Sequence, residues 1–437
     1  MQKSIKFLLF LTLAFQLGAE AVAQDAPSET VVAPPPGPTG FGSSRQDPKN
    51  ILKDIEARAT QKVGLIPFSP LQPLRDRFKS FNDALYQRAG MKFGVAFHHL
   101  FQGASNVLPM TADSGTATDT DITGKWELFR RGQPTMGELM FSVEGRWDYD
   151  TVGPQDIGFI SIATAGGTAN TFSAYDPSFI LRNLFYRQGG EEAGWVYRLG
   201  KITVDALFLT NRHISPNTTF LPNAGTGVFA AGFADSGLGI IGAWYLSDRV
   251  YIGAGITDAN GDRFNWGDIG AGQFYKGVEL GVKINPLTDK ASFSKLLFWH
   301  TDGTKDGQPI NANTGEAGWG FALVAEQELT YDGRLVLIGR YGRSFDDAAI
   351  YDQQAGLHLL YYDPFGRFEN DAIGTAFNWV DSTFENTRDE FNWETFYRFP
   401  LLPDVDTTLS YQAVFDPAFT TDFDFSSVYS LRMTTSF

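Results

Sequence analysis

The chain has 437 residues, no cysteine and a formal net charge of −15. Without cysteine, neither a disulfide framework nor a thiolate metal site is available. The acidic balance and the lack of a basic cluster exclude nucleic acid as a partner, because phosphate binding depends on Lys and Arg.

The first 23 residues have the layout of a secretory signal peptide. Lys3 and Lys6 precede an apolar run over 7–17, and the small residues of 21–23 form a cleavage site. An apolar run of about 11 residues is too short for a spanning helix, which needs about 20. We therefore expect residues 1–23 to be removed and the mature chain to lie outside the cytoplasm.

A flexible linker rich in Pro and Gly is expected over 24–45, and two short helices over 46–90. Asp47 and Pro48 can begin the first helix. The second ends at Gly90 and has an apolar face, made of Leu74, Phe78, Phe81 and Leu85. We expect both helices to pack at the periplasmic end of the structure that follows. Contact with peptidoglycan or a protein partner is the alternative.

Beyond residue 90 the sequence is rich in aromatic residues and yet polar on average. The whole chain has 38 Phe, 16 Tyr and 9 Trp, and its mean hydropathy is −0.17. Membrane β-barrels combine these properties, because an apolar, aromatic outer face alternates with residues that face water.

The hydrophobic pattern from residue 91 has the period of two that indicates β-strands. In 137–149, for example, Leu139, Phe141 and Val143 alternate with Ser142 and Glu144. Segments of this kind have the length of about 9 to 11 residues that a spanning strand needs. We expect strands near 91–101, 125–131, 137–149, 179–188, 193–203, 238–247, 249–258, 276–285, 293–301, 316–329, 333–343, 353–362, 370–381, 389–399, 405–415 and 426–437. The predicted fold class is therefore all-β: a transmembrane antiparallel β-barrel of about sixteen strands over 91–437, with short N-terminal periplasmic helices.

The connections between these segments alternate between short and long. Short turns are expected at 132–136, 189–192 and 286–289, and long loops at 102–124, 150–178, 204–237 and 260–275. Bacterial outer-membrane barrels have short periplasmic turns and long extracellular loops. The pattern therefore predicts a barrel in the outer membrane of a Gram-negative-type bacterium, rather than a soluble sandwich or propeller.

The last expected strand carries apolar residues on one face, namely Tyr429, Leu431, Met433 and Phe437. A final strand of this kind, closing on Phe, resembles the signal by which outer-membrane barrels are recognised for assembly. We therefore expect outer-membrane lipid and the barrel assembly machinery as partners.

Sixteen strands enclose a lumen wide enough for an aqueous channel. The longest expected loop, 204–237, follows the fifth strand, where porins fold a loop inward to narrow the pore. Its polar and aromatic residues suit an eyelet for a neutral polyol, with Phe208 and Phe220 expected to stack on sugar rings.

Several short motifs resemble the OprB-type carbohydrate-selective porins. They are Leu184-Phe-Tyr-Arg-Gln188, Tyr197-Arg-Leu-Gly-Lys201 with Asp205, Phe208, Asn211 and Arg212, and Glu394-Thr-Phe-Tyr-Arg398 with Pro403, Leu409, Tyr411-Gln412 and Pro417. The resemblance covers roughly residues 74–437, although the glycine pair usual in that family just after Asn106 is missing. It implies passive, selective diffusion of small carbohydrates through a constricted barrel.

Charged residues of both signs are expected along the lumen in comparable numbers, which supplies donors and acceptors for hydroxyl groups. The candidates for the pore constriction are Arg198, Asp205, Phe208, Asn211, Arg212, Glu144, Arg146, Glu326 and Arg340. No catalytic, cofactor or metal residues are expected.

Other functions remain open at this point. A general or anion-selective porin is the closest alternative, but an anion-selective lumen would carry a surplus of Lys and Arg. A barrel enzyme is a more distant one, because the five histidines show no metal-site spacing and no serine nucleophile elbow occurs. The sequence also leaves open a homo-oligomer.

Overall fold

The computed structural model describes residues 40–43, 47–59, 63–149, 152–168, 171–176, 178–284, 292–368 and 371–437. These residues all belong to one compact unit, Pro34–Phe437. The signal peptide expected over 1–23 and most of the linker expected over 24–45 lie outside the described residues.

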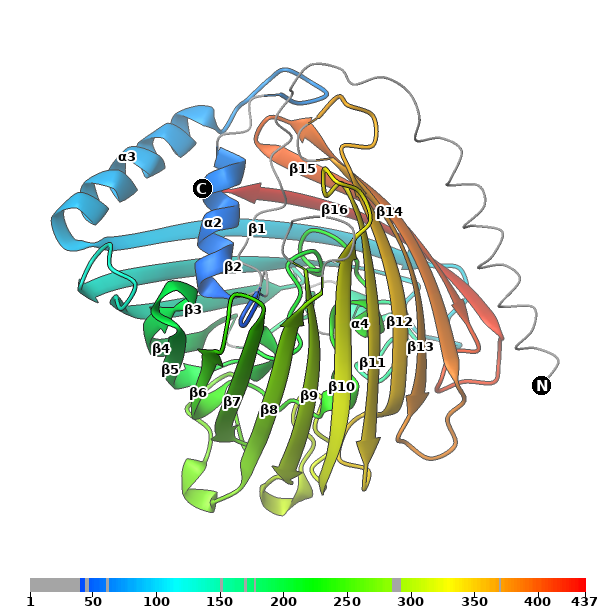
Figure 1. Ribbon diagram of the computed structural model, residues 1–437. Helices are drawn as coiled ribbons and strands as arrows, with labels where there is room; N and C mark the ends of the chain where they lie inside the picture. The colour runs from blue at the N-terminus through cyan, green and yellow to red at the C-terminus, as the bar shows by residue number, and fades with distance from the viewer. Residues whose placement is uncertain are drawn as a thin grey trace. The chain divides into compact units, whose positions relative to one another are not determined.

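Sixteen antiparallel strands form a closed barrel, in which each strand pairs with its neighbours in the chain and β1 pairs with β16 (Figure 1). The predicted all-β barrel of about sixteen strands is therefore confirmed. The strands are β1 (Met91–Ala104), β2 (Ser114–Phe129), β3 (Gly137–Trp147), β4 (Phe179–Gly190), β5 (Trp195–Ile202), β6 (Gly237–Tyr245), β7 (Val250–Asp258), β8 (Phe274–Lys283), β9 (Phe293–Asp302), β10 (Ala317–Glu328), β11 (Leu335–Phe345), β12 (Tyr351–Tyr362), β13 (Ala372–Ser382), β14 (Glu390–Leu402), β15 (Val405–Phe415) and β16 (Phe425–Ser436).

Alternation along each strand separates an apolar outer face from a lumen face. In β8, Val278 and Leu280 are 53% and 41% exposed, whereas Glu279 between them is 0% exposed. Because successive side chains of a strand point to opposite faces, Glu279 faces the lumen and its two neighbours face outward. Large outward side chains recur around the barrel, including Phe101, Trp126, Leu199, Ile240, Trp244, Phe298, Trp319, Phe377, Leu409 and Tyr429.

The barrel closes between β1 and β16. The backbone N–H of Val95 donates to the carbonyl oxygen of Phe437 at 3.1 Å, and the N–H of Phe437 donates back at 2.8 Å. The ring of Phe437 packs edge-on against Phe97, 6.3 Å between centroids. Neither β1 nor β16 is left with a free edge that could pair with another chain.

Strand β2 is longer than the pattern predicts. It starts at Ser114, so the expected loop over 102–124 is wrong, and the connection after β1 ends at Asp113. Its outward face carries Thr118 and Thr120 in place of apolar residues, which removes the alternation. The hydroxyl groups of Thr118 and Tyr149 form a hydrogen bond, with 2.7 Å between the oxygens, so Tyr149 shields this threonine.

Two longer helices precede the barrel, α2 (Pro48–Ala59) and α3 (Gln72–Ala89). Asp47 caps α2 by accepting a bond from the N–H of Lys49 at 2.9 Å. Helix α3 ends at Gly90, whose positive φ of 71° suits a helix C-cap. The other helices are short: α4 (Asn223–Thr226), η1 (Pro154–Asp156), η2 (Glu191–Ala193), η3 (Val204–Ala206), η4 (Phe229–Ala231), η5 (Ile269–Ala271) and η6 (Lys305–Gly307). Within the described ranges, no helix is both long and apolar enough to cross a lipid bilayer.

The two longer helices lie on opposite sides of the barrel wall. Ile55 of α2 lies close to Gly94, which is on the lumen face of β1. Phe78 and Phe81 of α3 instead pack edge-on against the outward ring of Phe93, at 5.2 and 5.8 Å between centroids. Helix α2 therefore narrows the mouth of the lumen, whereas α3 covers the outer rim.

Candidate functional site: a constricted lumen

The connection between β5 and β6, residues 203–236, folds into the lumen, and we name it the inward loop. Its N-terminal half is held by lumen-facing carboxylates of β8 and β10. The N–H of Leu209 donates to Glu279 at 2.5 Å, the amide of Asn211 to Glu326 at 2.6 Å, and the guanidinium of Arg212 to Glu328 at 2.6 Å.

Arginines of β11, β14 and β16 hold the middle of the inward loop by its backbone. Arg398 of β14 donates to the carbonyl of Thr218 at 3.0 Å, and Arg432 of β16 to that of Thr219 at 2.8 Å. Arg340 of β11 donates to the carbonyl of Gly225 at 2.9 Å. The loop therefore crosses the lumen and lies against strands β8 to β16.

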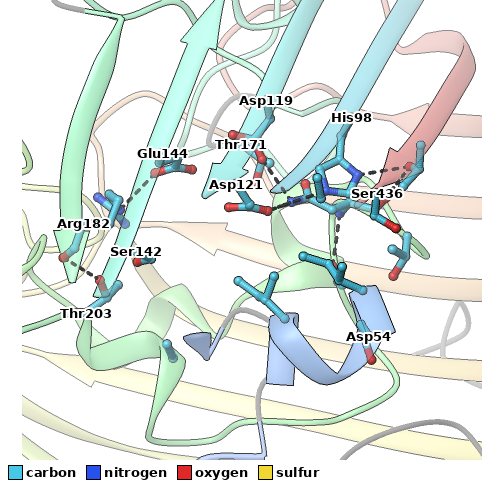
Figure 2. Close-up of a pocket in the computed structure, with 18 of the residues that line it drawn as sticks. Asp54, His98, Asp119, Asp121, Ser142, Glu144, Thr171, Arg182, Thr203 and Ser436 are labelled. Atoms are coloured by element: carbon cyan, nitrogen blue, oxygen red, sulfur yellow. Dashed lines mark hydrogen bonds and ion pairs between the residues drawn. The ribbon is translucent and has the colours of Figure 1, made fainter. Parts of the chain in front are cut away.

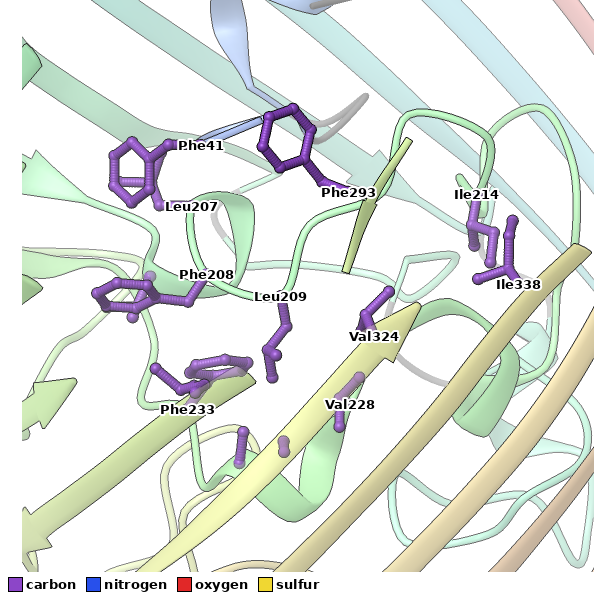
Figure 3. Close-up of a cluster of buried hydrophobic side chains, with 14 of the residues drawn as sticks. Phe41, Leu207, Phe208, Leu209, Ile214, Val228, Phe233, Phe293, Val324 and Ile338 are labelled. Atoms are coloured by element: carbon purple, nitrogen blue, oxygen red, sulfur yellow. The ribbon is translucent and has the colours of Figure 1, made fainter. Parts of the chain in front are cut away.

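Apolar side chains fill the space between the inward loop and this wall (Figure 3). Phe208 is 1% exposed and Phe220 is 0% exposed. Phe220 packs edge-on against Phe396 at 5.0 Å and against His358 at 4.9 Å. The expectation that these two rings stack on a sugar is wrong for this arrangement, because their faces are covered by protein.

The chain segment before the barrel enters the lumen from the side of the short turns, and we name residues 40–43 and 47–59 the N-terminal insert. Phe41 packs against Phe208 and Tyr251, with centroid separations of 6.1 and 5.9 Å. Lys295 of β9 donates to the carbonyl of Gly40 at 2.8 Å and to that of Thr210 at 2.6 Å. The insert and the inward loop are thus joined to each other and to the wall.

The connection between β3 and β4 also folds inward. The N–H groups of Gly166 and Gly167 donate to Glu390 at 2.8 Å and to Gln412 at 2.9 Å, on the lumen faces of β14 and β15. This loop therefore narrows the lumen from the end opposite to the N-terminal insert.

A cavity of about 90 Å³ remains between the inward loop, helix α2 and the wall formed by β16 and β1 to β4 (Figure 2). We name it the eyelet cavity. Its polar lining consists of Asp54, His98, Asp119, Asp121, Ser142, Glu144, Arg146, Thr171, Arg182, Asn183, Thr203, Asp205, Ser215, Asn217, Thr218, Thr434 and Ser436.

Arginine–carboxylate pairs cross one side of the eyelet cavity. Glu144 accepts a bond from Nε of Arg146 at 2.9 Å and pairs with Nε of Arg182 at 3.0 Å. Arg182 also pairs with Asp235, which in turn accepts from Nε of Arg263 at 2.6 Å. Burial alone would raise the pKa of Asp235, but the two arginines outweigh this effect and hold it at about 2.

The other side of the eyelet cavity is dominated by hydrogen-bond acceptors. The amide of Asn217 donates to Asp119 at 3.0 Å and to Asp121 at 3.1 Å. His98 lies 3.5 Å from Asp121. Asp205 instead belongs to the side of the arginine–carboxylate pairs, where burial raises its pKa to about 6, although Arg182 opposes the shift.

Three of the nine predicted constriction residues, Glu144, Arg146 and Asp205, line the eyelet cavity. Asp205 also lines a second, smaller cavity of about 40 Å³, which the inward loop itself largely encloses, together with Phe208, Asn211 and Arg340. The remaining three serve to hold segments in place. Arg198 pairs with Asp47 of the N-terminal insert, and Arg212 and Glu326 lie in the contact between the inward loop and β10.

Several residues of the eyelet cavity were missed by the sequence pattern, above all His98, Asp119, Asp121, Arg182 and Asn217. Asp119 and Asp121 have the same parity as Lys125 and Glu127, which belong to the strand expected at 125–131, so alternation places all four side chains on one face. That parity could have identified them had β2 been extended to its observed start.

The lining can replace the hydration of a polar solute. Carboxylates and amide oxygens accept hydrogen bonds, whereas guanidinium groups and hydroxyls donate them. Across the described part of the chain, no group of three or more His, Asp or Glu side chains is placed to hold a metal ion.

The comparisons with known proteins agree with the barrel fold. The sequence pattern of the family described as carbohydrate-selective porin, OprB family, matches residues 128–437. The structure of Pseudomonas putida OprB at high pH superposes with a TM-score of 0.65 at 14% identity, covering 82% of this chain and 97% of that one. The low-pH structure of the same protein gives a TM-score of 0.50 at 12% identity, covering 82% and 96%. Among curated proteins no match is found.

Proposed function

The chain belongs to the OprB family of carbohydrate-selective porins, and from this premise we propose that small sugars diffuse through it by way of the eyelet cavity. A porin of this kind works passively: solutes move down their own gradient through an aqueous barrel. The family and the fold indicate a channel rather than an enzyme.

The observation that carries this proposal is the position of the inward loop. The loop lies against β8 to β16, so the space between it and β1 to β4 is the route on which a solute meets polar side chains. A sugar that enters so narrow a space loses hydration from several hydroxyl groups. The lining must replace those bonds, since an unpaired buried polar group costs about 1 to 3 kcal/mol.

We place the porin in the outer membrane of a Gram-negative-type bacterium, with the short turns and the N-terminal insert on the periplasmic side. The outward band of large apolar side chains supports this placement, because lipid is the solvent that such a surface prefers. The partners that follow are membrane lipid around the strands and the barrel assembly machinery during insertion. A homo-oligomer is a separate question, which native mass spectrometry of the purified protein would answer.

The proposal can be tested by filling the eyelet cavity with a larger side chain. Ser142 lines the cavity on β3, and its neighbour Val143 faces outward. In planar bilayers, added glucose or maltose should reduce the ion conductance of the wild-type protein. Ser142→Phe should lower both conductance and sugar permeation, whereas the matched variant Val143→Phe should leave both unchanged. Unaltered sugar permeation in folded Ser142→Phe protein would mean that the solute route lies elsewhere.

A further inference from the structure

The charges that line the eyelet cavity are not balanced. Five carboxylates line it, but only two guanidinium groups do. They are Asp54, Asp119, Asp121, Glu144 and Asp205 on the one hand and Arg146 and Arg182 on the other. The cavity therefore carries a surplus of negative charge, which a narrow, partly desolvated passage makes more effective.

Both arginines are already paired with carboxylates. Arg146 pairs with Glu144 and lies 3.5 Å from Asp119. Arg182 pairs with Glu144 and with Asp235, which lies behind it on the inward loop. An anionic solute would have to compete with these carboxylates for the same guanidinium groups. The surplus charge thus resides at Asp121, on the opposite side, and at Asp205, which lies next to this network; neither forms an ion pair with a guanidinium group among the described residues.

The cavity also has acceptors without donors. The carbonyl oxygen of the Asn217 side chain and one oxygen of Asp205 have no hydrogen-bond partner among the described residues. Asn217 is only 8% exposed, and its NH₂ group is fixed by its bonds to Asp119 and Asp121. The amide orientation is therefore set, and its oxygen remains as an acceptor in the lining. A buried acceptor of this kind favours a solute that brings a donor.

We propose that the eyelet cavity prefers solutes bearing a protonated amine, so that amino sugars are a substrate class of this porin. An ammonium group brings up to three donors and a positive charge, which matches the acceptors at Asn217, Asp121 and Asp205. Neutral sugars can use their hydroxyl groups there but gain nothing from the charge. Sugar acids carry the same sign of charge as the cavity and are disfavoured. The inference rests on the proposed function, since it names the solute that the same cavity selects.

The test compares four sugars of similar size with the full-length protein in liposomes at pH 7.5. Glucosamine carries the amine, N-acetylglucosamine has the amine blocked, glucose is neutral and glucuronate is acidic. We expect glucosamine to enter about fivefold faster than glucose, which corresponds to about 1 kcal/mol. N-acetylglucosamine should behave like glucose, and glucuronate should be slowest. A KCl gradient across a planar bilayer should give a reversal potential of the sign for cation preference.

Variants locate the effect within the molecule. Asp121→Asn and Asp205→Asn should each reduce the ratio of glucosamine to glucose and shift the reversal potential toward zero. Asp306→Asn, which removes an exposed carboxylate outside both cavities, should change neither.

The outcomes separate this inference from the proposed function. If glucose enters and glucosamine enters no faster, the amine preference is refuted while the sugar pore stands. If no sugar enters although ions pass, the proposed function fails together with the inference. If the ratio stays at the wild-type value in both folded Asp variants, the preference arises elsewhere and the assignment to this cavity is wrong. The comparison of the four sugars needs no variant, so it decides the inference even if a variant fails to fold.

Discussion

Replacing Arg212 by Met should release the inward loop from the barrel wall. Arg212 pairs with Glu328 at 2.6 Å and lies 3.4 Å from Glu326, and these carboxylates are 1% and 8% exposed. Removing the guanidinium leaves two buried carboxylates with one cation fewer. Breaking a buried ion pair in this way costs about 3 to 5 kcal/mol. This free energy destabilises the state in which the loop is bound to the wall, because in the released state water can reach both carboxylates.

Cleavage by chymotrypsin measures how often the loop is released. Phe208 and Phe220 are buried while the loop is bound, so cleavage requires local opening. When opening is fast relative to cleavage, the rate follows the population of the open form. A loss of about 3 kcal/mol should therefore raise the cleavage rate in Arg212→Met about a hundredfold. Ion conductance should rise, and the difference between sugars should shrink.

A double-mutant cycle distinguishes this pair from a general loss of packing. Glu328→Gln removes the partner carboxylate, and the double variant Arg212→Met/Glu328→Gln removes both charges. Because neither charge is then left without its partner, the double variant should recover much of the protection from cleavage. Two results would refute the reasoning: cleavage of Arg212→Met less than tenfold faster than wild type, or a double variant that is cleaved faster than either single variant.

Three other predictions concern selectivity, the N-terminal insert and topology. First, the cation preference should weaken as the pH falls through about 6, because Asp205 then takes up a proton and loses its negative charge. Burial raises the pKa of Asp205 against the opposing charge of Arg182, and the charges of Asp235 and Glu144 face the same site. Asp205→Asn should therefore flatten the dependence of the reversal potential on pH. Second, Phe41→Ala should destabilise the N-terminal insert by about 3 to 5 kcal/mol, since it removes the ring that packs against Phe208 and Tyr251. Single-channel conductance should then rise. An unchanged conductance would mean that the insert does not restrict the pore. Third, a cysteine at the exposed residue Glu385, between β13 and β14, should react with an impermeant thiol reagent on intact cells. A cysteine at Gln133, in the turn between β2 and β3, should not react. The reverse pattern would invert the proposed topology.

The strands could be predicted from the sequence because each has to present an apolar face outward and a polar face inward. β15 begins and ends where the alternation predicts, at Val405 and Phe415. The prediction failed at the start of β2, where threonines stand on the outward face and Tyr149 covers one of them. A pattern based on polarity alone cannot predict that a neighbouring side chain will contact an outward threonine and shield it.

The eyelet cavity could be predicted only in part, for a related reason. Strand parity placed Glu144 and Arg146 in the lumen, and the position of the loop after the fifth strand pointed to Asp205. Parity says which face a side chain occupies but not what packs against it. The covering of Phe208 and Phe220 depends on the path of the inward loop, which contacts between distant strands determine.

The way in which the wall holds the inward loop affects how the sequence of that loop can change. Arg398, Arg432 and Arg340 all donate to backbone carbonyl oxygens, at Thr218, Thr219 and Gly225. Every amino acid carries the same carbonyl, so these bonds persist when the side chains at these three positions are exchanged. Mutation and selection can therefore alter the side chains on this part of the loop while its path is kept. The same property makes the middle of the loop a suitable place to engineer pores for other solutes by substitution alone.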